Sequence, residues 1–148
     1  MTVALVADTH NLLRPELLAG LAGVDRILHL GDVCTPEVLE RLQAIAPVEA
    51  VRGNCDGSWA AAIPHTRAVD VYGKTAYMVH IRADLDVDPA TSGIDYVFFG
   101  HSHQPCDEVT DGVRYFNPGS AGPRRFSLPI TFALIRPDGA LELREIEA

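Results

Sequence analysis

The sequence has little cysteine, little positive charge and no long apolar run. Its three cysteines, Cys34, Cys55 and Cys106, show no C-x-x-C spacing, which excludes a disulfide framework and a zinc knuckle. Twelve basic residues stand against twenty acidic ones, and the net charge of −8 argues against general binding to nucleic-acid backbones or anionic membranes. The apolar stretch at the N-terminus already ends at Asp8, too early for a signal peptide or a membrane span. We therefore expect a cytoplasmic protein in a reducing compartment.

Internal repeats, low-complexity tracts and Pro/Gly/Ser-rich linkers are absent as well. The 148 residues, 47% of them hydrophobic, suffice to bury one core but are too few for a large barrel or a second domain of enzyme size. The composition therefore predicts one globular domain that spans residues 1–148.

The first half of the chain alternates between strand and helix signals. The apolar run at 3–7 is typical of a strand buried on both faces. Pro15 and Pro36 stand where a first helical residue is expected, and Thr35 is an N-cap residue type. The expected elements are a strand at 3–7, a helix at 15–23, a strand at 26–30, a helix at 36–46 and a strand at 48–51. This order predicts parallel strands joined by right-handed crossovers.

Hairpin signals dominate the second half. Turn residues such as Gly73, Asp111-Gly112 and Asp138-Gly139 separate short apolar runs. The expected strands are 68–72, 75–80, 96–99, 113–116, 130–135 and 141–146. Two sheets stacked face to face, with helices outside, would accommodate both halves of the chain.

Polar side chains suited to metal binding follow several of these strands. Loops beyond the carboxyl ends of parallel strands are where open α/β sheets place their sites, so these groups are expected to converge. The candidates are Asp8, His10, Asp32, Asn54, His80, His101 and His103. Each motif alone also fits an ordinary turn or polar loop, but their coincidence at strand ends favours a site.

The donor chemistry favours two cations rather than one. Seven candidates exceed what a four-coordinate zinc needs, and a mixed oxygen and nitrogen set suits manganese, iron or zinc in a pair. A carboxylate such as Asp32 can bridge two cations, with a hydroxide between them as the nucleophile for a phosphoester. His101 and His103 alternate in an extended segment, so they point to different sides and would serve different metals.

The motifs D-x-H, G-D, G-N-C-D, a lone His and G-H-x-H, in this order, resemble those of the calcineurin-like metallophosphoesterases. The small size, Cys55 and the run Asn117-Pro118-Gly119-Ser120 resemble the compact single-domain phosphodiesterase subgroup. The resemblance implies an α/β (α+β) fold, a four-layer αββα sandwich of two mixed β-sheets flanked by helices, formed by one domain, 1–148.

The resemblance also implies a metal-dependent phosphoric ester hydrolase. One metal would be held by Asp8, His10, Asp32 and His103, and a second by Asp32, Asn54, His80 and His101. A metal-bridging hydroxide would hydrolyse a small or nucleotide-like phosphodiester, with Asp32, Asn54 and Cys55 as catalytic residues and Asn54 and Arg124 as substrate contacts. Manganese is the expected cation, with nickel, iron or zinc as alternatives, and the hairpin edges would allow a homo-oligomer.

Three positions depart from the pattern of the family. Cys55 replaces a histidine that protonates the leaving group, and a thiol with a pKa near 8.5 is a poorer acid. Asn11 and Ile81 replace glycines, and we expect the branched Ile81 to change the local backbone. The segment 81–93 is too poor in helix formers for the helix common in the family.

Other polar residues have simpler expected roles. His29 is expected as a packed residue or a partner of a ligand, Asp56 as the anchor of its loop, and Trp59 as part of the core. Arg125 shares with Arg124 the expected phosphate contact. The competing hypothesis is a catalytically weak, metal-binding protein-interaction scaffold on the same fold, because the subgroup's fold serves this purpose in eukaryotic sorting complexes. A metallo-β-lactamase-like hydrolase is disfavoured because its H-x-H-x-D-H run is absent.

Overall fold

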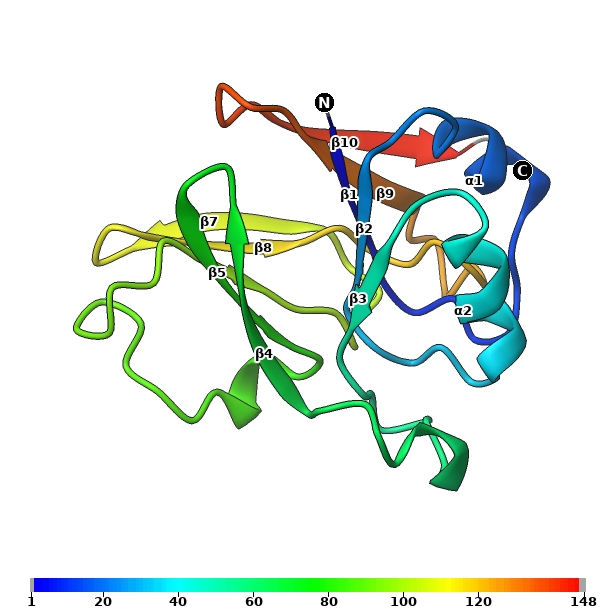
Figure 1. Ribbon diagram of the computed structural model, residues 1–148, viewed down its shortest axis with the longest axis horizontal. Coiled ribbons are helices and arrows are strands. Elements are labelled where there is room, and N and C mark those ends of the chain that lie inside the picture. The colour runs from blue at the N-terminus through cyan, green and yellow to red at the C-terminus, as the bar shows by residue number, and fades with distance from the viewer. Residues whose placement is uncertain (1, 147–148) are drawn as a thin grey trace.

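Two five-stranded β-sheets lie face to face in the computed structural model, which describes residues 2–146 (Figure 1). The strands are β1 Val3–Val6, β2 Arg26–His29, β3 Val48–Ala50, β4 Thr66–Val71, β5 Lys74–Val79, β6 Tyr96–Phe98, β7 Cys106–Thr110, β8 Val113–Asn117, β9 Ile130–Ile135 and β10 Leu141–Ile146. The helices are α1 Pro15–Gly20 and α2 Pro36–Gln43, with two short 3-10 helices, η1 Ser58–Ala60 and η2 Arg82–Asp84.

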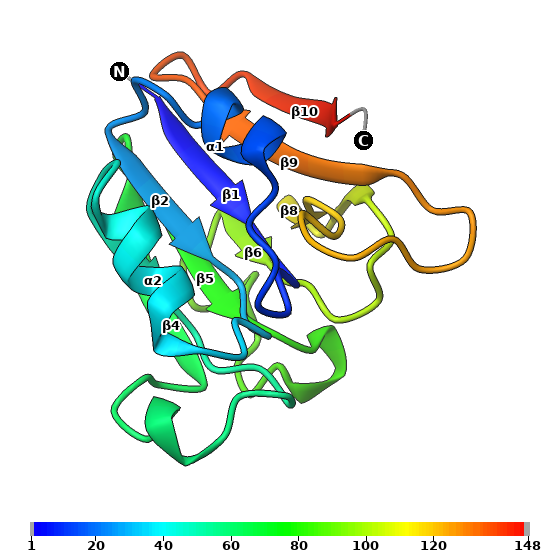
Figure 2. The same ribbon diagram turned by 90° about the vertical axis from the view of Figure 1, so that its right-hand side faces the viewer.

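The first sheet has the order β10-β9-β1-β2-β3. Strands β1, β2 and β3 are parallel, as expected, and β9 pairs with β1 in the antiparallel sense. All four residues of β1 are buried, because Ala4 and Val6 face the helices whereas Val3 and Leu5 face the second sheet. Helices α1 and α2 cover the outer face of this sheet (Figure 2). The carboxyl ends of the parallel strands therefore point to one edge of the molecule.

Helix α2 begins where the sequence predicts and ends earlier. Thr35 occupies the N-cap position and Pro36 the first turn, but the Thr35 hydroxyl donates to Oδ1 of Asn11, 2.8 Å away, rather than capping the helix. The helix ends at Gln43 instead of reaching residue 46. Pro47 accounts for part of this difference, because it disfavours helical backbone at the residue before it.

The second sheet has the order β4-β5-β6-β8-β7 and is mixed. Strand β6 pairs in parallel with β5 and β8, and the outer pairs β4-β5 and β7-β8 are antiparallel hairpins. Strand β7 is not predicted from the sequence, because this edge strand is polar and mostly exposed and shows no apolar alternation. It forms through the turn Asp111-Gly112, where both residues have positive φ, 52° and 78°.

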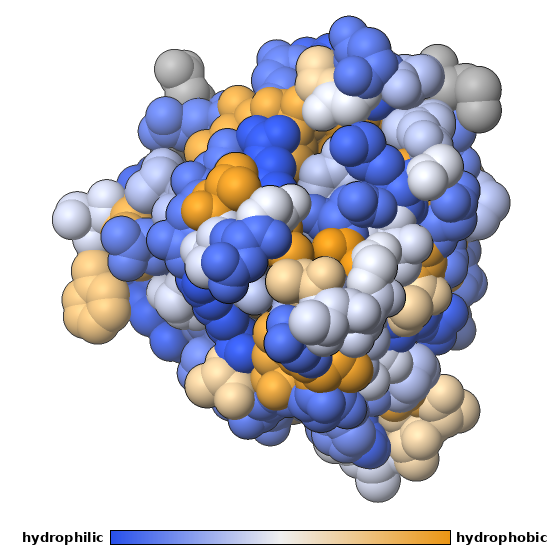
Figure 3. Space-filling model, turned by 90° about the vertical axis from the view of Figure 1, so that its left-hand side faces the viewer, coloured by the Kyte–Doolittle hydropathy of each residue, from blue (hydrophilic) through white to orange (hydrophobic). Residues whose placement is uncertain are grey.

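The outer face of the second sheet is covered by a loop rather than a long helix. Leu85 and Val87 of this loop pack on Val79, Val97 and the rest of a small apolar cluster, and η2 is the loop's one helical turn among the described residues. Seen from this side, the surface is mostly polar with apolar side chains between (Figure 3). The two-sheet sandwich is confirmed, and the helical layer over its second sheet is reduced to one turn, in accord with the poor helix formers of 81–93.

Candidate metal centre

The seven predicted donor residues come together where the carboxyl ends of parallel strands from both sheets meet. Asp8 follows β1 and Asp32 follows β2, and His80 and His101 follow β5 and β6 of the second sheet. The imidazole of His80 lies within 4 Å of both carboxylates, with its Nε2 3.8 Å from Asp8 Oδ1 and 3.1 Å from Asp32 Oδ2. The two sheets therefore contribute to one polar centre.

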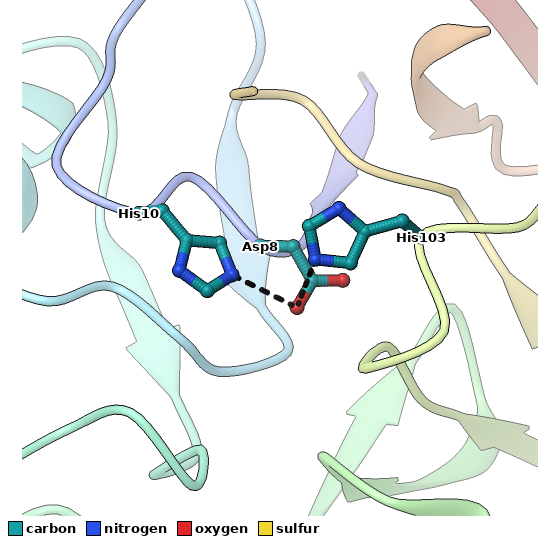
Figure 4. Close-up of side chains that lie close together, drawn as sticks. All are labelled: Asp8, His10 and His103. Atoms are coloured by element: carbon teal, nitrogen blue, oxygen red, sulfur yellow. Dashed lines mark ion pairs between the residues drawn. The ribbon is translucent and has the colours of Figure 1, made fainter. Parts of the chain in front are cut away.

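One group of donors consists of Asp8, His10 and His103 (Figure 4). The Nε2 atoms of His10 and His103 lie 3.9 and 3.8 Å from Asp8 Oδ1, and the two rings are 5.2 Å apart between centroids. One ligand atom from each residue lies within 4.8 Å of the others. Asp8 and His103 are buried, so this group is closed to bulk solvent on most sides.

A second group consists of Asp32, Asn54, His80 and His101. Asn54 Oδ1 lies 3.0 Å from His80 Nε2 and 3.1 Å from His101 Nδ1. His80 donates from Nδ1 to the carbonyl of Leu30, 2.7 Å away, which turns its Nε2 toward the carboxylates. Asp32 Oδ2 also lies 3.5 Å from His10 Nε2, so Asp32 joins the two groups.

The arrangement fits divalent cations. Asp8 Oδ1 and His10 Nε2 are buried and lack a hydrogen-bond partner among the described residues, a costly state for polar atoms unless another group satisfies them. Carboxylate oxygens and imidazole nitrogens are ligands that first-row transition metals accept. The chemistry and the orphaned atoms therefore agree on a metal centre.

The two central carboxylates differ in acidity. Burial raises the pKa of Asp8 to about 7, although the neighbouring His80 works in the opposite direction. Burial alone would also raise the pKa of Asp32. Hydrogen bonds from His80 and from the Cys55 amide outweigh burial and lower this pKa to about 2. Burial, followed by the charge of Arg125, lowers the pKa of His103 to about 4. A cation at Asp8 would favour the charged carboxylate and offset the penalty of burial.

Several donor residues have an unusual backbone. Asp8, His10, Asp32, His101 and His103 all have positive φ, between 44° and 72°. Non-glycine residues rarely adopt this region, because it brings Cβ close to the following carbonyl oxygen. Hydrogen bonds from the amide of His10 to Asp32 O, 2.9 Å, and of His101 to Asp8 Oδ2, 3.1 Å, hold the loops there. Such concentrated strain is typical of functional sites.

The Gly53–Asp56 loop is fixed to Asp32. The Asp56 carboxylate accepts hydrogen bonds from the amides of Asp32, Cys34 and Gly53, which confirms its predicted role as an anchor. A Cβ atom on Gly53 would lie 2.2 Å from Asp32 Oδ1, so only glycine fits at this position. The tight approach explains why a glycine precedes the donor residue Asn54.

Two thiols flank the centre. The Cys55 amide donates to Asp32 Oδ1, 2.8 Å away, and its Sγ lies within 4.8 Å of ligand atoms of His10 and Asp32. Cys34 Sγ lies 3.6 Å from His10 Nδ1. Burial raises the pKa of the Cys34 thiol to about 11 and also raises that of Cys55. Both shifts favour the protonated thiol.

The predicted substrate contact, Arg124, makes a hydrogen bond within its own loop. Arg124 is exposed and donates from Nη1 to the carbonyl of Leu128 in its own loop, 3.2 Å away. The charge of Arg125, after burial, contributes to the lowered pKa of His103. Of these two arginines, Arg125 is the one whose charge shifts the pKa of a donor residue. Nothing in the sequence separates these neighbours.

The sequence also suggested roles for His29 and Trp59 and an altered backbone at Ile81 and Asn11. His29 is buried, accepts from the Gly31 amide at Nδ1 and hydrogen-bonds Thr9 Oγ1 through Nε2, so it supports the loops around the donors. Trp59 packs against the core, as expected. Ile81 has an ordinary extended backbone with φ −111°, whereas Asn11 keeps a positive φ of 63°, which asparagine tolerates.

Asn117 and Ser120 support the donor loops, a role that the sequence analysis did not assign to them. Asn117 donates from Nδ2 to the carbonyl of Gly100, 3.0 Å away, and accepts from the Gly119 amide. The Ser120 hydroxyl donates to the carbonyl of Asp8, 3.2 Å away. The run Asn117-Pro118-Gly119-Ser120 was the available signal, because buried polar residues of this kind need partners.

A two-sheet sandwich with oxygen and nitrogen donors gathered at its strand ends defines a metallohydrolase type of protein. The calcineurin-like phosphoesterase superfamily domain matches residues 1–139, and the chain belongs to this family. The family assignment makes the protein a phosphoesterase-type hydrolase, with divalent metals implied by the family and by the donor groups.

Named relatives share nearly the whole chain. A probable metallophosphoesterase of Methanothermobacter thermautotrophicus is 31% identical over 151 residues, covering 94% of this chain and 87% of the relative. The phosphodiesterase YfcE of Escherichia coli is 27% identical over 163 residues, covering 93% and 89%.

Solved structures show the same fold at lower identity. A structure described as a novel archaeal phosphodiesterase superposes with a TM-score of 0.83 at 19% identity, covering 99% of this chain and 100% of that one. Vacuolar protein sorting 29 from Cryptosporidium parvum gives a TM-score of 0.78 at 20% identity, covering 99% of this chain and 97% of that one.

Among residues 2–146, no helix is long and apolar enough to cross a membrane.

Proposed function

We propose that the protein is a dinuclear metal-dependent phosphodiesterase that hydrolyses a small or nucleotide-like phosphoester. The observation that carries this proposal is the division of seven donor residues into two groups joined by Asp32. Asp8, His10 and His103 would hold one cation, and Asn54, His80 and His101 the other, with Asp32 shared. Manganese is the proposed cation, with nickel, iron or zinc as alternatives.

The cations, when bound, would supply Lewis-acid stabilisation of the phosphoryl oxygens and a nucleophile at neutral pH. The protein's own groups would position the substrate. Asn54 turns its Oδ1 toward His80 and His101, and its Nδ2 donates to Cys55 Sγ, 3.8 Å away, a long contact that a phosphoryl oxygen would replace. Asn54 is exposed, so a substrate can reach it.

Cys55 is the proposed neighbour of the leaving group. Its thiol is exposed, and its pKa is raised by burial of part of the side chain and by the charge of Asp32. A thiol of this kind is a weak proton donor at neutral pH. We therefore expect the enzyme to favour esters with good leaving groups, for which solvent can supply the proton.

The test compares the wild-type protein with Asp32→Asn and with the surface control Asp111→Asn, which keeps the positive φ of that turn. Each protein is stripped of metal, reloaded with manganese and assayed on an aryl phosphodiester, with the bound metal counted. We expect turnover only with metal, loss of at least about 100-fold in Asp32→Asn, and no change in the control. Two metals per chain without turnover would contradict the proposal.

The second candidate is a catalytically weak metal-binding interaction scaffold on the same fold. Its support is the likeness to vacuolar protein sorting 29. The complete set of donors favours the enzyme, and hydrogen bonds to neighbouring loops hold the side chains of His80, Asp32 and Asp8 in place. Metal binding without hydrolysis of any tested ester would favour the scaffold.

The remaining proposals concern binding partners, cellular location and oligomeric state. We propose that the protein works as one domain in the cytoplasm on a small phosphoester, without general affinity for nucleic acid or membranes, because its net charge is −8. The unpaired edges of β7 and β10 would allow a homo-oligomer. Light scattering and sedimentation measure the oligomeric state.

A further inference from the structure

A cavity of about 360 Å³ opens beside the second donor group. Asn54 and His80 line it, so it is continuous with the proposed metal centre. A substrate whose phosphoryl group lies at Asn54 would therefore extend its organic part into this cavity. Its volume is in the range of small-ligand sites.

The walls of the cavity carry opposite charges. Among the lining residues, Arg52 donates from Nη2 to Nε2 of His65. The lining also includes the exposed carboxylates of Asp84, at the end of η2, and Asp86. Asp86 has a fixed orientation, because the Tyr77 hydroxyl donates to its Oδ1, 2.6 Å away. The cavity thus offers both acceptors and donors.

Apolar contact comes from aliphatic side chains only. Val79 and Ile81 line the cavity, and no aromatic ring belongs to its lining among the described residues, apart from the imidazoles of His65 and His80. Stacking of a nucleobase and caging of a quaternary ammonium both rely on large aromatic faces. These two kinds of organic group therefore fit less well than a compact polar one.

We propose that the cavity binds the alcohol part of the phosphoester, and that this part is a polyol, such as a glycerol or sugar unit, held by Asp84 and Asp86. Carboxylates accept hydrogen bonds from vicinal hydroxyls, as an acidic residue does for ribose in dinucleotide-binding folds. Arg52 would donate to the oxygens of the polyol. This inference rests on the proposed function, because it places a phosphoryl group at Asn54.

Binding to the manganese-loaded protein tests the proposal without turnover. Calorimetry would compare ribose 5-phosphate and sn-glycerol 3-phosphate, which carry cyclic and open-chain polyols, with phenyl phosphate and inorganic phosphate. The variant is Asp84→Asn/Asp86→Asn, and the control is Asp88→Asn, an exposed residue of the same loop outside the cavity lining.

We expect the double variant to weaken binding of a polyol phosphate about tenfold and to change phenyl phosphate and inorganic phosphate by less than about twofold. Either polyol responding supports the proposal, and the one that responds more identifies the cyclic or open-chain class. Tyr77→Phe should weaken the same ligand by a smaller factor, because Asp86 loses the hydroxyl that orients it. An equal change for all four ligands, or no change for both polyols, would overturn the proposal.

The result separates this proposal from the proposed function. Hydrolysis of an aryl diester combined with equal effects on all four ligands would leave the enzyme and remove the polyol site. Polyol selectivity without hydrolysis of any ester would leave the site and remove the catalytic function. Failure of all four ligands to bind the metal-loaded protein would overturn the polyol proposal, and turnover of the aryl diester would then decide the proposed function alone.

Discussion

The two sides of the metal centre are held in different ways. Asp8 and His103 are almost fully buried, whereas Asn54 and His101 are exposed and Asn54 borders a cavity. Burial fixes ligands in place before any substrate arrives. Exposure lets a phosphoester approach the other side. The comparison indicates that one side mainly retains metal and the other mainly meets substrate.

The largest expected effect separates these two sides directly. Asp8→Asn keeps the size of the side chain but removes the buried charge, and we expect metal affinity to fall by at least about 100-fold. His101→Asn, on the exposed side, should cost about tenfold. Metal retention against a chelator measures both. Equal losses in the two variants would contradict the comparison.

The next effect concerns the loop that joins Asn54 to Asp32. Gly53→Ala places a Cβ 2.2 Å from Asp32 Oδ1 and 2.3 Å from its amide nitrogen, so we expect the free energy of unfolding to fall by about 3 kcal/mol. Gly57→Ala is the matched control, because no atom lies within 4 Å of its Cβ, and it should change stability by less than about 0.5 kcal/mol. Chemical denaturation measures both. Similar denaturation midpoints for the two variants would show that the loop accommodates the added methyl group at little cost.

The smallest effect lies beneath the buried side. Burial lowers the pKa of His29 to about 3 from an ordinary value of 6.5. Between these two pH values, His29 binds a proton in the unfolded chain but not in the folded one. The stability of the metal-free protein therefore falls as the pH drops below 6.5, and this one group accounts for about 2 kcal/mol by about pH 5.

His29→Gln removes that proton and keeps a polar side chain in place. Denaturation of both apoproteins at neutral pH and at about pH 5 compares their slopes, and we expect the variant to lose less stability in acid. Parallel slopes would show that His29 is protonated in the fold. The other titrating groups are common to both proteins and cancel in the difference.

Much of the centre could be predicted because its residues sit at strand ends. The burial of 3–7, followed at once by Asp8, gives both a strand and a donor, and the same holds for Asp32 and His80. Parallel topology brings Asp8 and Asp32 to one edge of the first sheet, and the stacking of the second sheet adds His80. The residues that line the cavity, in contrast, come from segments that are distant in sequence, so no local sequence pattern predicts the cavity.

The missed features share a physical cause. Strand β7 is polar because it is an edge, and hydrophobic periodicity does not report edges. Arg124 donates within its own loop, whereas the charge of Arg125 acts on His103, a difference that composition does not encode. Ile81 has an extended backbone with φ −111°, outside the positive-φ region that favours glycine.

The pairing of β1 with β9 has a consequence for how the protein is made. Asp8 is synthesised before Ser120, which lies 112 residues further along the chain and whose hydroxyl donates to the Asp8 carbonyl, and β1 pairs with residues 133–135. The nascent chain must therefore be synthesised as far as residue 135 before these contacts secure Asp8. Contacts this distant in sequence slow folding, and a cation arriving earlier would meet an unfinished centre.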